Sequence, residues 1–463
     1  MNSIEKRALS TLASLYALRM MGLFMVLPLL SLYHSDYNAS ASLMGIALGI
    51  YGVSQAMFQI PLGMLSDKIG RKPVIVFGLV LFAAGSLVAA YAETGGWLIF
   101  GRALQGSGAI AASVMALLTD LTREEYRTKA LAVVGMIIGL SFSVAVVLGP
   151  ILANTVELFT DFNGLSGVFF LTAIFAVLGI FVVLFLVPNP PDQHAHADHR
   201  WAKGTFSLVL ANKQLWLMCI SVFILHLGLI VLFYVIPLKL NMMGIEQKWH
   251  WVVYIVVVVF GFVAMVPMMI MSEKYQKGAK LFKLSVLMIM FVTLIWALID
   301  THNWFWLLPF LIYFTAFTFL EATLPSWISR IAPAGGKGAA MGLFSTFQFI
   351  GAAIGGILAG SLYEVFNENI QNIFWLLLVL QIVWLVVIWK IQQPVLLENV
   401  SLEIQAKNPE DAQHLKSQIL AVPGVEQVEI LMDEQLVCLK ISKALHSGEQ
   451  IRANIENIIN KGN

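Results

Sequence analysis

The chain has 463 residues, of which 59% are hydrophobic and only 12% are charged, and its mean hydropathy is +0.82. Ordinary soluble domains carry about 25% charged residues, so this composition excludes that class and indicates a membrane protein. The formal net charge of +1 points to no particular partner, and we expect the lipid bilayer rather than a nucleic acid to surround most of the chain.

A membrane-spanning helix needs roughly 20 mainly apolar residues, and twelve such runs occur. They cover residues 8–32, 43–65, 73–92, 97–119, 130–153, 165–188, 213–240, 249–272, 282–299, 303–329, 338–362 and 371–391. Because backbone groups in lipid must bond internally, runs of this length predict helices rather than a barrel. The sequence therefore predicts an all-α membrane protein of twelve transmembrane helices.

Basic residues are distributed unevenly between the connections. With the N-terminus inside, the inner connections hold most of the Lys and Arg residues, including Lys68, Arg71 and Lys72. The outer connections hold acids such as Glu93 and Asp161 and few bases. Positive charge favours the cytoplasmic side, so we expect both termini to be cytoplasmic.

Breaks in hydropathy divide the chain into four parts. A polar linker at 189–212 separates two six-helix halves, 1–188 and 213–392. His194, His196 and His199 in the linker have a spacing that could bind a metal, but nothing fixes their geometry, and we expect a solvated linker without metal. Residues 398–463 alternate and turn in the order βαββα, which predicts a small cytoplasmic ferredoxin-like α+β domain.

Four ionisable residues lie away from the ends of the predicted helices. An ionisable group in hydrocarbon is costly and marks function by default. Each of the four lies on the first helix of a three-helix unit, so we expect these helices to line one cavity. The residues are Arg19, Arg102, His226 and Glu321.

Glu321 is suited to carry a proton, because desolvation raises the pKa of a carboxyl group and a nearby cation lowers it. We expect Arg19 to be that cation and His226 to take part in proton coupling. Structural roles remain open for these positions, with His226 as a packing residue and Arg102 as a brace for its helix. Three amides add polar lining to the expected cavity: Gln55, Gln59 and Gln348.

The connection at residues 63–73 compresses five polar or charged residues and two glycines between two apolar runs. Gly70 permits a tight turn, and Arg71 is placed to bridge acids, with Asp120 as an available partner. We expect this loop to act as a conformational latch rather than only as a positive-inside loop. The latch residues are Gly63, Asp67, Gly70, Arg71, Lys72 and Asp120.

Two segments resemble motifs of the major facilitator superfamily. Gly63-Met-Leu-Ser-Asp67-Lys-Ile-Gly70-Arg71-Lys72 resembles its cytoplasmic loop 2–3 motif, and the segment from Arg102 to Ala109 resembles its helix 4 motif. The resemblance implies two six-helix halves in a bacterial inner membrane. It also implies that Asp67 docks near residues 335–337 in the outward-open state.

With its C-terminal domain, the chain is similar to proton-driven drug exporters of that superfamily. Such exporters carry a glycine-proline motif in helix 5, where this chain has Gly149-Pro150 but lacks the two glycines that usually follow. The tail is similar in topology to heavy-metal-associated domains but lacks their Cys-x-x-Cys, so we expect no metal there.

The function predicted is proton-coupled secondary transport, with export of small amphipathic molecules or drugs and a regulatory C-terminal domain. Nothing in the sequence resembles a nucleotide-binding P-loop, so we expect an ion gradient to supply the energy and no cofactor to be needed. The alternatives are a transporter-like receptor or a proton-coupled uptake symporter. No catalytic cluster supports an enzyme.

Overall fold

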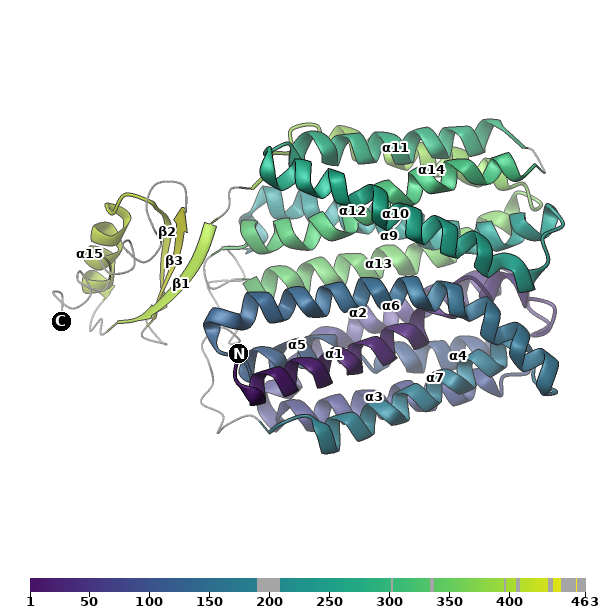
Figure 1. Ribbon diagram of the computed structural model, residues 1–463, viewed down its shortest axis with the longest axis horizontal. Helices are drawn as coiled ribbons and strands as arrows, with labels where there is room; N and C mark the ends of the chain where they lie inside the picture. The colour runs from purple at the N-terminus through teal and green to yellow at the C-terminus, as the bar shows by residue number, and fades with distance from the viewer. Residues whose placement is uncertain are drawn as a thin grey trace. The chain divides into compact units, whose positions relative to one another are not determined.

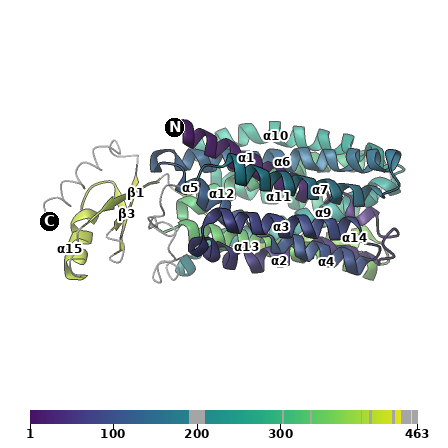
Figure 2. The ribbon, with the colours of Figure 1, turned by 90° about the horizontal axis from the view of Figure 1, so that it is seen from below.

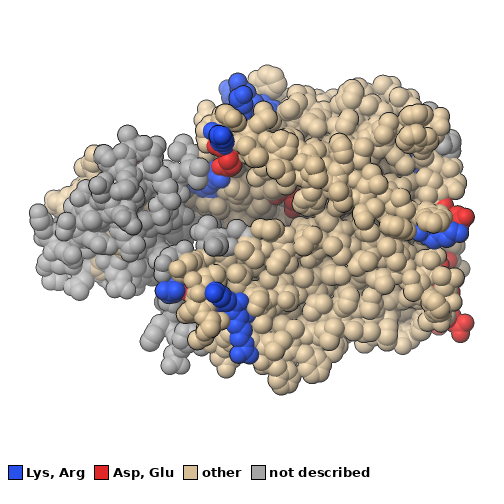
Figure 3. All heavy atoms as spheres, in the orientation of Figure 1, with Lys and Arg blue, Asp and Glu red and all other residues tan. Residues whose placement is uncertain are grey.

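The structure is a computed structural model, and it describes residues 1–189, 209–300, 303–333, 337–394, 397–404, 409–431, 436–442 and 455. Long helices run side by side through most of the chain (Figure 1). On the face in Figure 3, charged side chains gather at the two ends of this bundle and are nearly absent between them. This distribution is that of a protein whose middle lies in lipid.

The helices follow the apolar runs of the sequence. They are α1 (Ser3–Phe24), α2 (Ala41–Ile69), α3 (Arg71–Ala90), α4 (Gly95–Ser107), α5 (Ala111–Asp120), α6 (Glu124–Phe159), α7 (Gly164–Phe181), α9 (Lys213–Met242), α10 (His250–Lys274), α11 (Gly278–Leu298), α12 (Leu308–Ile331), α13 (Lys337–Val365) and α14 (Ile370–Val387). A π-helical turn, η2 (Val182–Leu186), continues α7.

Eleven helical stretches of the described chain are long and apolar enough to cross a membrane, with α4 and α5 counted as one. The twelfth predicted span, 8–32, corresponds to α1, which is not among them. Arg7 and Arg19 lower the hydropathy of α1, and its helix ends at Phe24 rather than continuing to residue 32. The prediction of twelve spans is thus confirmed for eleven.

The chain divides into two compact units. The first comprises Met1–Asp192, Ile220–Glu321 and Ser345–Trp389, and the second comprises Gln193–Cys219, Ala322–Phe344 and Lys390–Asn463. Residues 190–208 of the predicted linker, including its three histidines, lie outside the described residues. The predicted boundaries between the halves remain a prediction.

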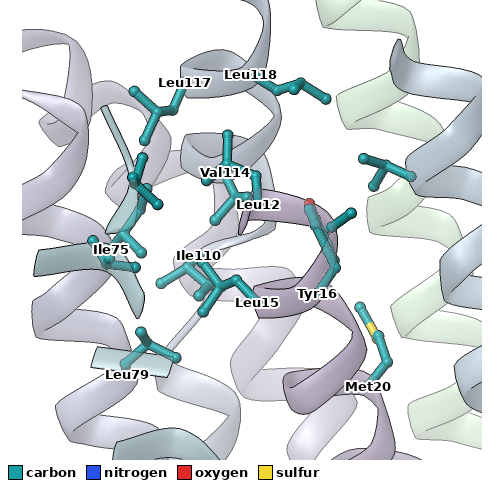
Figure 4. Close-up of a cluster of buried hydrophobic side chains, with 14 of the residues drawn as sticks. Leu12, Leu15, Tyr16, Met20, Ile75, Leu79, Ile110, Val114, Leu117 and Leu118 are labelled. Carbon is teal, nitrogen blue, oxygen red and sulfur yellow. The ribbon is translucent and has the colours of Figure 1, made fainter. Parts of the chain in front are cut away.

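One buried apolar cluster joins α1 to α3, α5 and α6. Figure 4 shows Leu12 of α1 beside Val114 of α5 and Leu15 beside Ile110, with Ile75 and Leu79 of α3 in the same cluster. The Tyr16 hydroxyl donates a hydrogen bond to the Ala111 carbonyl at 2.7 Å. This packing holds α1 in the bundle although its own hydropathy is low.

The fourth predicted span, 97–119, is interrupted near its middle. Residues 108–110 are not helical and separate α4 from α5. A Cβ atom on Gly108 would lie 2.3 Å from the Gly78 carbonyl oxygen, so glycine is required where this segment crosses α3. The break leaves backbone carbonyls at mid-span that need donors other than those of a continuous helix.

Glycines bring α2 and α13 together toward the end of the bundle that is predicted to be outer. A Cβ atom on Gly49 would lie 2.3 Å from the Ala353 carbonyl oxygen, and one on Gly45 would lie 2.6 Å from that of Gly356. The two helices run side by side in Figure 2. Nearby, the Tyr234 hydroxyl donates to the Ala41 carbonyl at 2.9 Å, so α9 is tied to the start of α2. These contacts close this end between the first and second predicted halves.

The C-terminal part contains a three-stranded antiparallel sheet in the order β1-β3-β2. Its elements are β1 (Leu397–Glu403), α15 (Pro409–Leu420), β2 (Val425–Leu431) and β3 (Leu436–Ser442). Leu402, Ile419 and Leu439 belong to its buried core, which is separate from the apolar clusters of the helices. The predicted strands and first helix are present, whereas the predicted last helix, apart from Ile455, lies outside the described residues.

Glu5 fastens the start of α1 to the connection before α6. It completes a capping box with Asn2, and its carboxylate accepts a 2.9 Å hydrogen bond from Arg123 Nε. The side-chain hydrogen bond from Arg123 is the main reason that the pKa of Glu5 falls from 4.5 to about 2. A carboxyl group with a lowered pKa stabilises the folded state above its unfolded pKa and loses this effect as the pH falls toward the folded value.

Glu5→Gln should therefore lower the melting temperature of the purified protein at pH 7 by a few degrees. The difference from wild type should shrink as the pH falls from 4.5 to 2, which thermal unfolding followed by tryptophan fluorescence measures. Glu93→Gln, at an exposed position, provides the control. A difference that does not change over this pH range would contradict a role for the charge of Glu5.

Candidate functional site

Three polar side chains from three helices meet in the second predicted half. The Nε2 atom of His226 on α9 lies 3.6 Å from Glu321 Oε2 on α12. Gln348 Nε2 on α13 lies 2.7 Å from His226 Nε2 and 3.5 Å from Glu321 Oε1. The structure thus brings together three of the predicted cavity residues, and the group near Glu321 that can carry positive charge is a histidine.

The hydrogen bonds around His226 favour one tautomer. Its Nδ1 atom lies 3.1 Å from the Val222 carbonyl, which only accepts, so Nδ1 carries a proton. The neutral ring then accepts the Gln348 amide N–H at Nε2. Protonation at Nε2 would place an N–H bond beside the Glu321 carboxylate.

Glu321 is partly accessible although Leu320 and Leu324 on α12 are buried. Its side chain is 39% exposed, whereas that of His226 is 11% exposed. A carboxylate beside buried polar groups at mid-helix faces a water-filled space rather than lipid. The Glu321 carboxylate is therefore accessible while a histidine and an amide lie beside it.

Arg19 lies in the first predicted half and is only 3% exposed. Its Nη2 atom donates to Gln55 Oε1 and to the Gly108 carbonyl, both at 3.0 Å. Its guanidinium carbon lies 5.9 Å from the centre of the Phe82 ring. Among the described residues no acid forms an ion pair with Arg19, so the expected pairing of Arg19 with Glu321 is not seen.

Arg102 and Gln59, two other residues of the predicted cavity, lie in the first predicted half and are not part of the cluster around Glu321. Arg102 is 1% exposed and donates to the Ala47 carbonyl and to Gln105 Oε1, with its guanidinium 4.9 Å from the Tyr51 ring. These contacts fasten α4 to α2. They agree with the alternative in which Arg102 has a structural role and braces its helix. Gln59 is buried on α2, and its Oε1 atom has no hydrogen-bond partner in the part of the chain that the structure describes.

An aromatic cluster that no motif of the sequence indicates lies between the two predicted halves. Phe142 of α6 lies 4.9 Å from Phe24 of α1, 5.8 Å from Phe233 of α9 and 6.1 Å from Phe314 of α12, measured between ring centres. Phe317 continues the cluster to His226, 6.2 Å away. These rings lie within long apolar runs, where a phenylalanine that faces another helix has no sequence signal that separates it from one that faces lipid.

The predicted latch residues lie around Arg71. Its Nε atom donates to Asp120 Oδ2 at 3.1 Å, and Nη1 donates to Ser66 at 2.8 Å and also contacts Asp67. Gly70 has φ of 99°, a conformation that favours glycine, and it joins α2 directly to α3. The loop therefore ties α2, α3 and α5 together through one guanidinium group.

Lys72 and Gly63, two other predicted latch residues, take no part in the hydrogen bonds of Arg71. Lys72 donates to the Val187 carbonyl at 2.6 Å and to Asn189 Oδ1 at 2.7 Å, so it holds the end of the first predicted half. A Cβ atom on Gly63 would lie 3.5 Å from Ala112 Cβ, an ordinary contact, so no close helix approach requires glycine there. The docking position expected for Asp67 includes residues 335 and 336, which lie outside the described residues.

We expect Asp67→Asn to lower transport while leaving expression and folding nearly unchanged. The Asp67 side chain is 37% exposed, and an ion pair with this exposure stabilises by only about 0.2–1 kcal/mol. If Asp67 is a latch in the outward-open state, its loss should shift the population toward inward-open. Distances between spin labels across the predicted cytoplasmic side measure the shift, with Lys68→Gln as control. Unchanged distances would contradict the latch.

The arrangement of the helices and the motif around Arg71 define a class of membrane transport protein. Residues 12–356 match the model of the Major Facilitator Superfamily, and the chain belongs to this family. It is a membrane transport protein and not an enzyme.

Individual proteins of this family are similar to the chain over most of its length. The chain is 40% identical over 452 residues to the inner membrane transport protein YajR of Escherichia coli (strain K12), covering 97% of each chain. It is 24% identical to the class H tetracycline resistance protein of Pasteurella multocida, covering 77% of this chain and 89% of that one. A bacterial homologue of the human lysosomal transporter Spinster, in an inward-facing occupied conformation, has the same fold, with a TM-score of 0.67 at 14% identity over 84% of this chain and 97% of that one.

Proposed function

We propose that this chain is a proton-coupled secondary transporter of the bacterial inner membrane that exports small amphipathic molecules. The observation that carries the proposal is the contact of Glu321 with His226 and Gln348 at mid-span. In a family of transporters, an accessible carboxylate beside a histidine is a site where one proton changes the charge of the cavity. The proposal includes α1 as a twelfth span, because its buried side chains pack within the helical bundle.

The coupling step follows from the two protonation states of the cluster. Without an added proton, Glu321 is negative and His226 is neutral. An added proton either neutralises Glu321 or turns the pair into an imidazolium and a carboxylate. Either way, the net charge near Gln348 changes by one unit. The affinity for a substrate in contact with this cluster changes as a result.

Export as the direction is supported by the names of relatives, which include tetracycline resistance proteins. The inner membrane is the location that the name of the Escherichia coli relative gives. The distribution of basic residues supports cytoplasmic termini. The sheet of the C-terminal part, with β3 between β1 and β2, supports a ferredoxin-like domain, and we assign it a regulatory role.

The test measures proton movement in sealed vesicles that contain the purified protein. A pH gradient is imposed, and a panel of amphipathic compounds that starts with tetracycline is added while a pH-sensitive dye is read. A compound that is transported in exchange for protons should dissipate the gradient in wild-type vesicles and not in empty ones. Compound accumulation that is insensitive to the pH gradient would overturn the proposal.

A further inference from the structure

The surroundings of Arg19 contain more hydrogen-bond donors than acceptors. A guanidinium group has five N–H bonds, and Nη2 uses its two on Gln55 and Gly108. The Nε and Nη1 atoms have no hydrogen-bond partner in the described part of the chain, although both are buried. Gln55 accepts from Arg19 and from the Tyr51 hydroxyl with its Oε1 atom, which leaves its Nε2 donor without a partner as well.

The positive charge of Arg19 also lacks compensation. Its two partners are a neutral amide and a neutral carbonyl, and an arginine does not lose its proton in proteins. A buried charge without a counter-ion is strongly unfavourable, so such a group marks a place where an anion binds. Gln59 lies one turn further along α2, and its Oε1 atom is an acceptor without a partner among the described residues. Donors without a partner still outnumber this one acceptor.

A bracing role explains only part of this arrangement. Arg19 Nη2 satisfies the carbonyl that the break between α4 and α5 exposes, and a single donor atom is enough for that purpose. The other two nitrogen atoms remain unexplained by the bracing role. The break itself lies near the middle of the 95–120 span, away from the level of lipid headgroups.

From these observations we infer that Arg19 and Gln55 form a subsite for a carboxylate group of the transported molecule. The inference rests on the proposed transport function and names the class of substrate, which is an amphipathic carboxylate. The anion accepts hydrogen bonds from Arg19 Nη1 or Nε and from Gln55 Nε2. The Phe82 ring lies 5.9 Å from the guanidinium carbon, so the subsite borders an apolar surface.

The test uses purified full-length protein and three probes that each carry a phenyl ring but differ in charge: benzoate, benzamide and benzylammonium. Millimolar benzoate should raise the melting temperature of the wild type by roughly 3 °C or more, whereas benzamide and benzylammonium should not. Arg19→Gln should lose the response to benzoate, and Arg19→Lys, which keeps the charge, should keep part of it.

Gln55→Glu keeps the test decisive if Arg19→Gln does not fold. This variant places a carboxylate of the protein itself beside Arg19, so it should raise the melting temperature without probe and abolish the benzoate response. Equal shifts with benzoate and benzamide, no shift with benzoate, or a full benzoate response in Gln55→Glu would each overturn the inference.

Binding is measured here without a pH gradient, so this outcome is independent of proton coupling. If the benzoate response fails while the vesicle assay shows coupling, the substrate class is wrong and the proposed function stands. If the vesicle assay fails while benzoate binds through Arg19, the subsite stands without proton coupling.

Discussion

Glu321→Gln should abolish transport that is driven by the pH gradient while leaving the binding of the transported compound nearly intact. Glutamine keeps the shape of the side chain and its capacity to hydrogen-bond to Gln348, but it cannot change charge. Its amide would also leave His226 without an acidic partner, since His226 Nε2 lies 3.6 Å from Glu321 Oε2 in the wild type. We expect gradient-driven flux to fall by at least about 100-fold, to the level of passive exchange.

Two measurements separate proton transfer from substrate recognition. The affinity for the compound found in the vesicle assay is measured as a function of pH in the wild type and in Glu321→Gln. A proton carrier predicts a pH-dependent affinity that becomes flat in the variant, and His226→Gln should reduce the dependence in the same direction. If Glu321 only recognises a cationic substrate, the variant loses binding instead. An equal pH dependence in both proteins would rule out Glu321 as the proton carrier.

Gly49→Val should separate α2 from α13 and prevent the predicted outer end from closing. A Cβ atom at this position would lie 2.3 Å from the Ala353 carbonyl oxygen and 2.9 Å from Ile357 Cγ1. The carbonyl belongs to a helix backbone and cannot rotate away, so the helices must move apart. Overpacking of this kind typically costs 1–3 kcal/mol, which is roughly a 5- to 150-fold change in the closed population. Transport should fall accordingly, because an alternating carrier must close at both ends.

The same substitution at Gly139 on α6 is a matched control, because nothing lies within 4 Å of a Cβ atom there. Spin labels in the loops 34–39 and 366–368 report the distance between the two halves at this end. The distance should increase in Gly49→Val and remain at the wild-type value in Gly139→Val. An increase in both variants, or in neither, would contradict the role of the close contact.

Hydropathy and local chemistry are enough to predict the individual helices and the polar loop around Arg71, without any knowledge of how the helices pack. Length and apolar composition predict individual helices because a backbone in lipid must bond within its own segment. The sequence indicates a tight polar loop around Arg71 for a similar reason: the turn at Gly70 and the polar side chains beside it interact over a few residues. The contact of Arg71 with Asp120 was also expected, since both lie at the same predicted end of neighbouring helices.

Tertiary structure alone decided which mid-span groups meet. The sequence places Arg19 and Glu321 at similar depths, but depth does not specify the direction in which a side chain points around its helix. The structure joins Glu321 to His226 and Gln348, and it directs Arg19 to Gln55 and to a carbonyl at the break between α4 and α5. That break depends on the close crossing of Gly108 and Gly78, and the aromatic cluster around Phe142 depends on contacts between helices far apart in the chain. Such contacts are decided by packing between helices, which the period and polarity of a single segment do not encode.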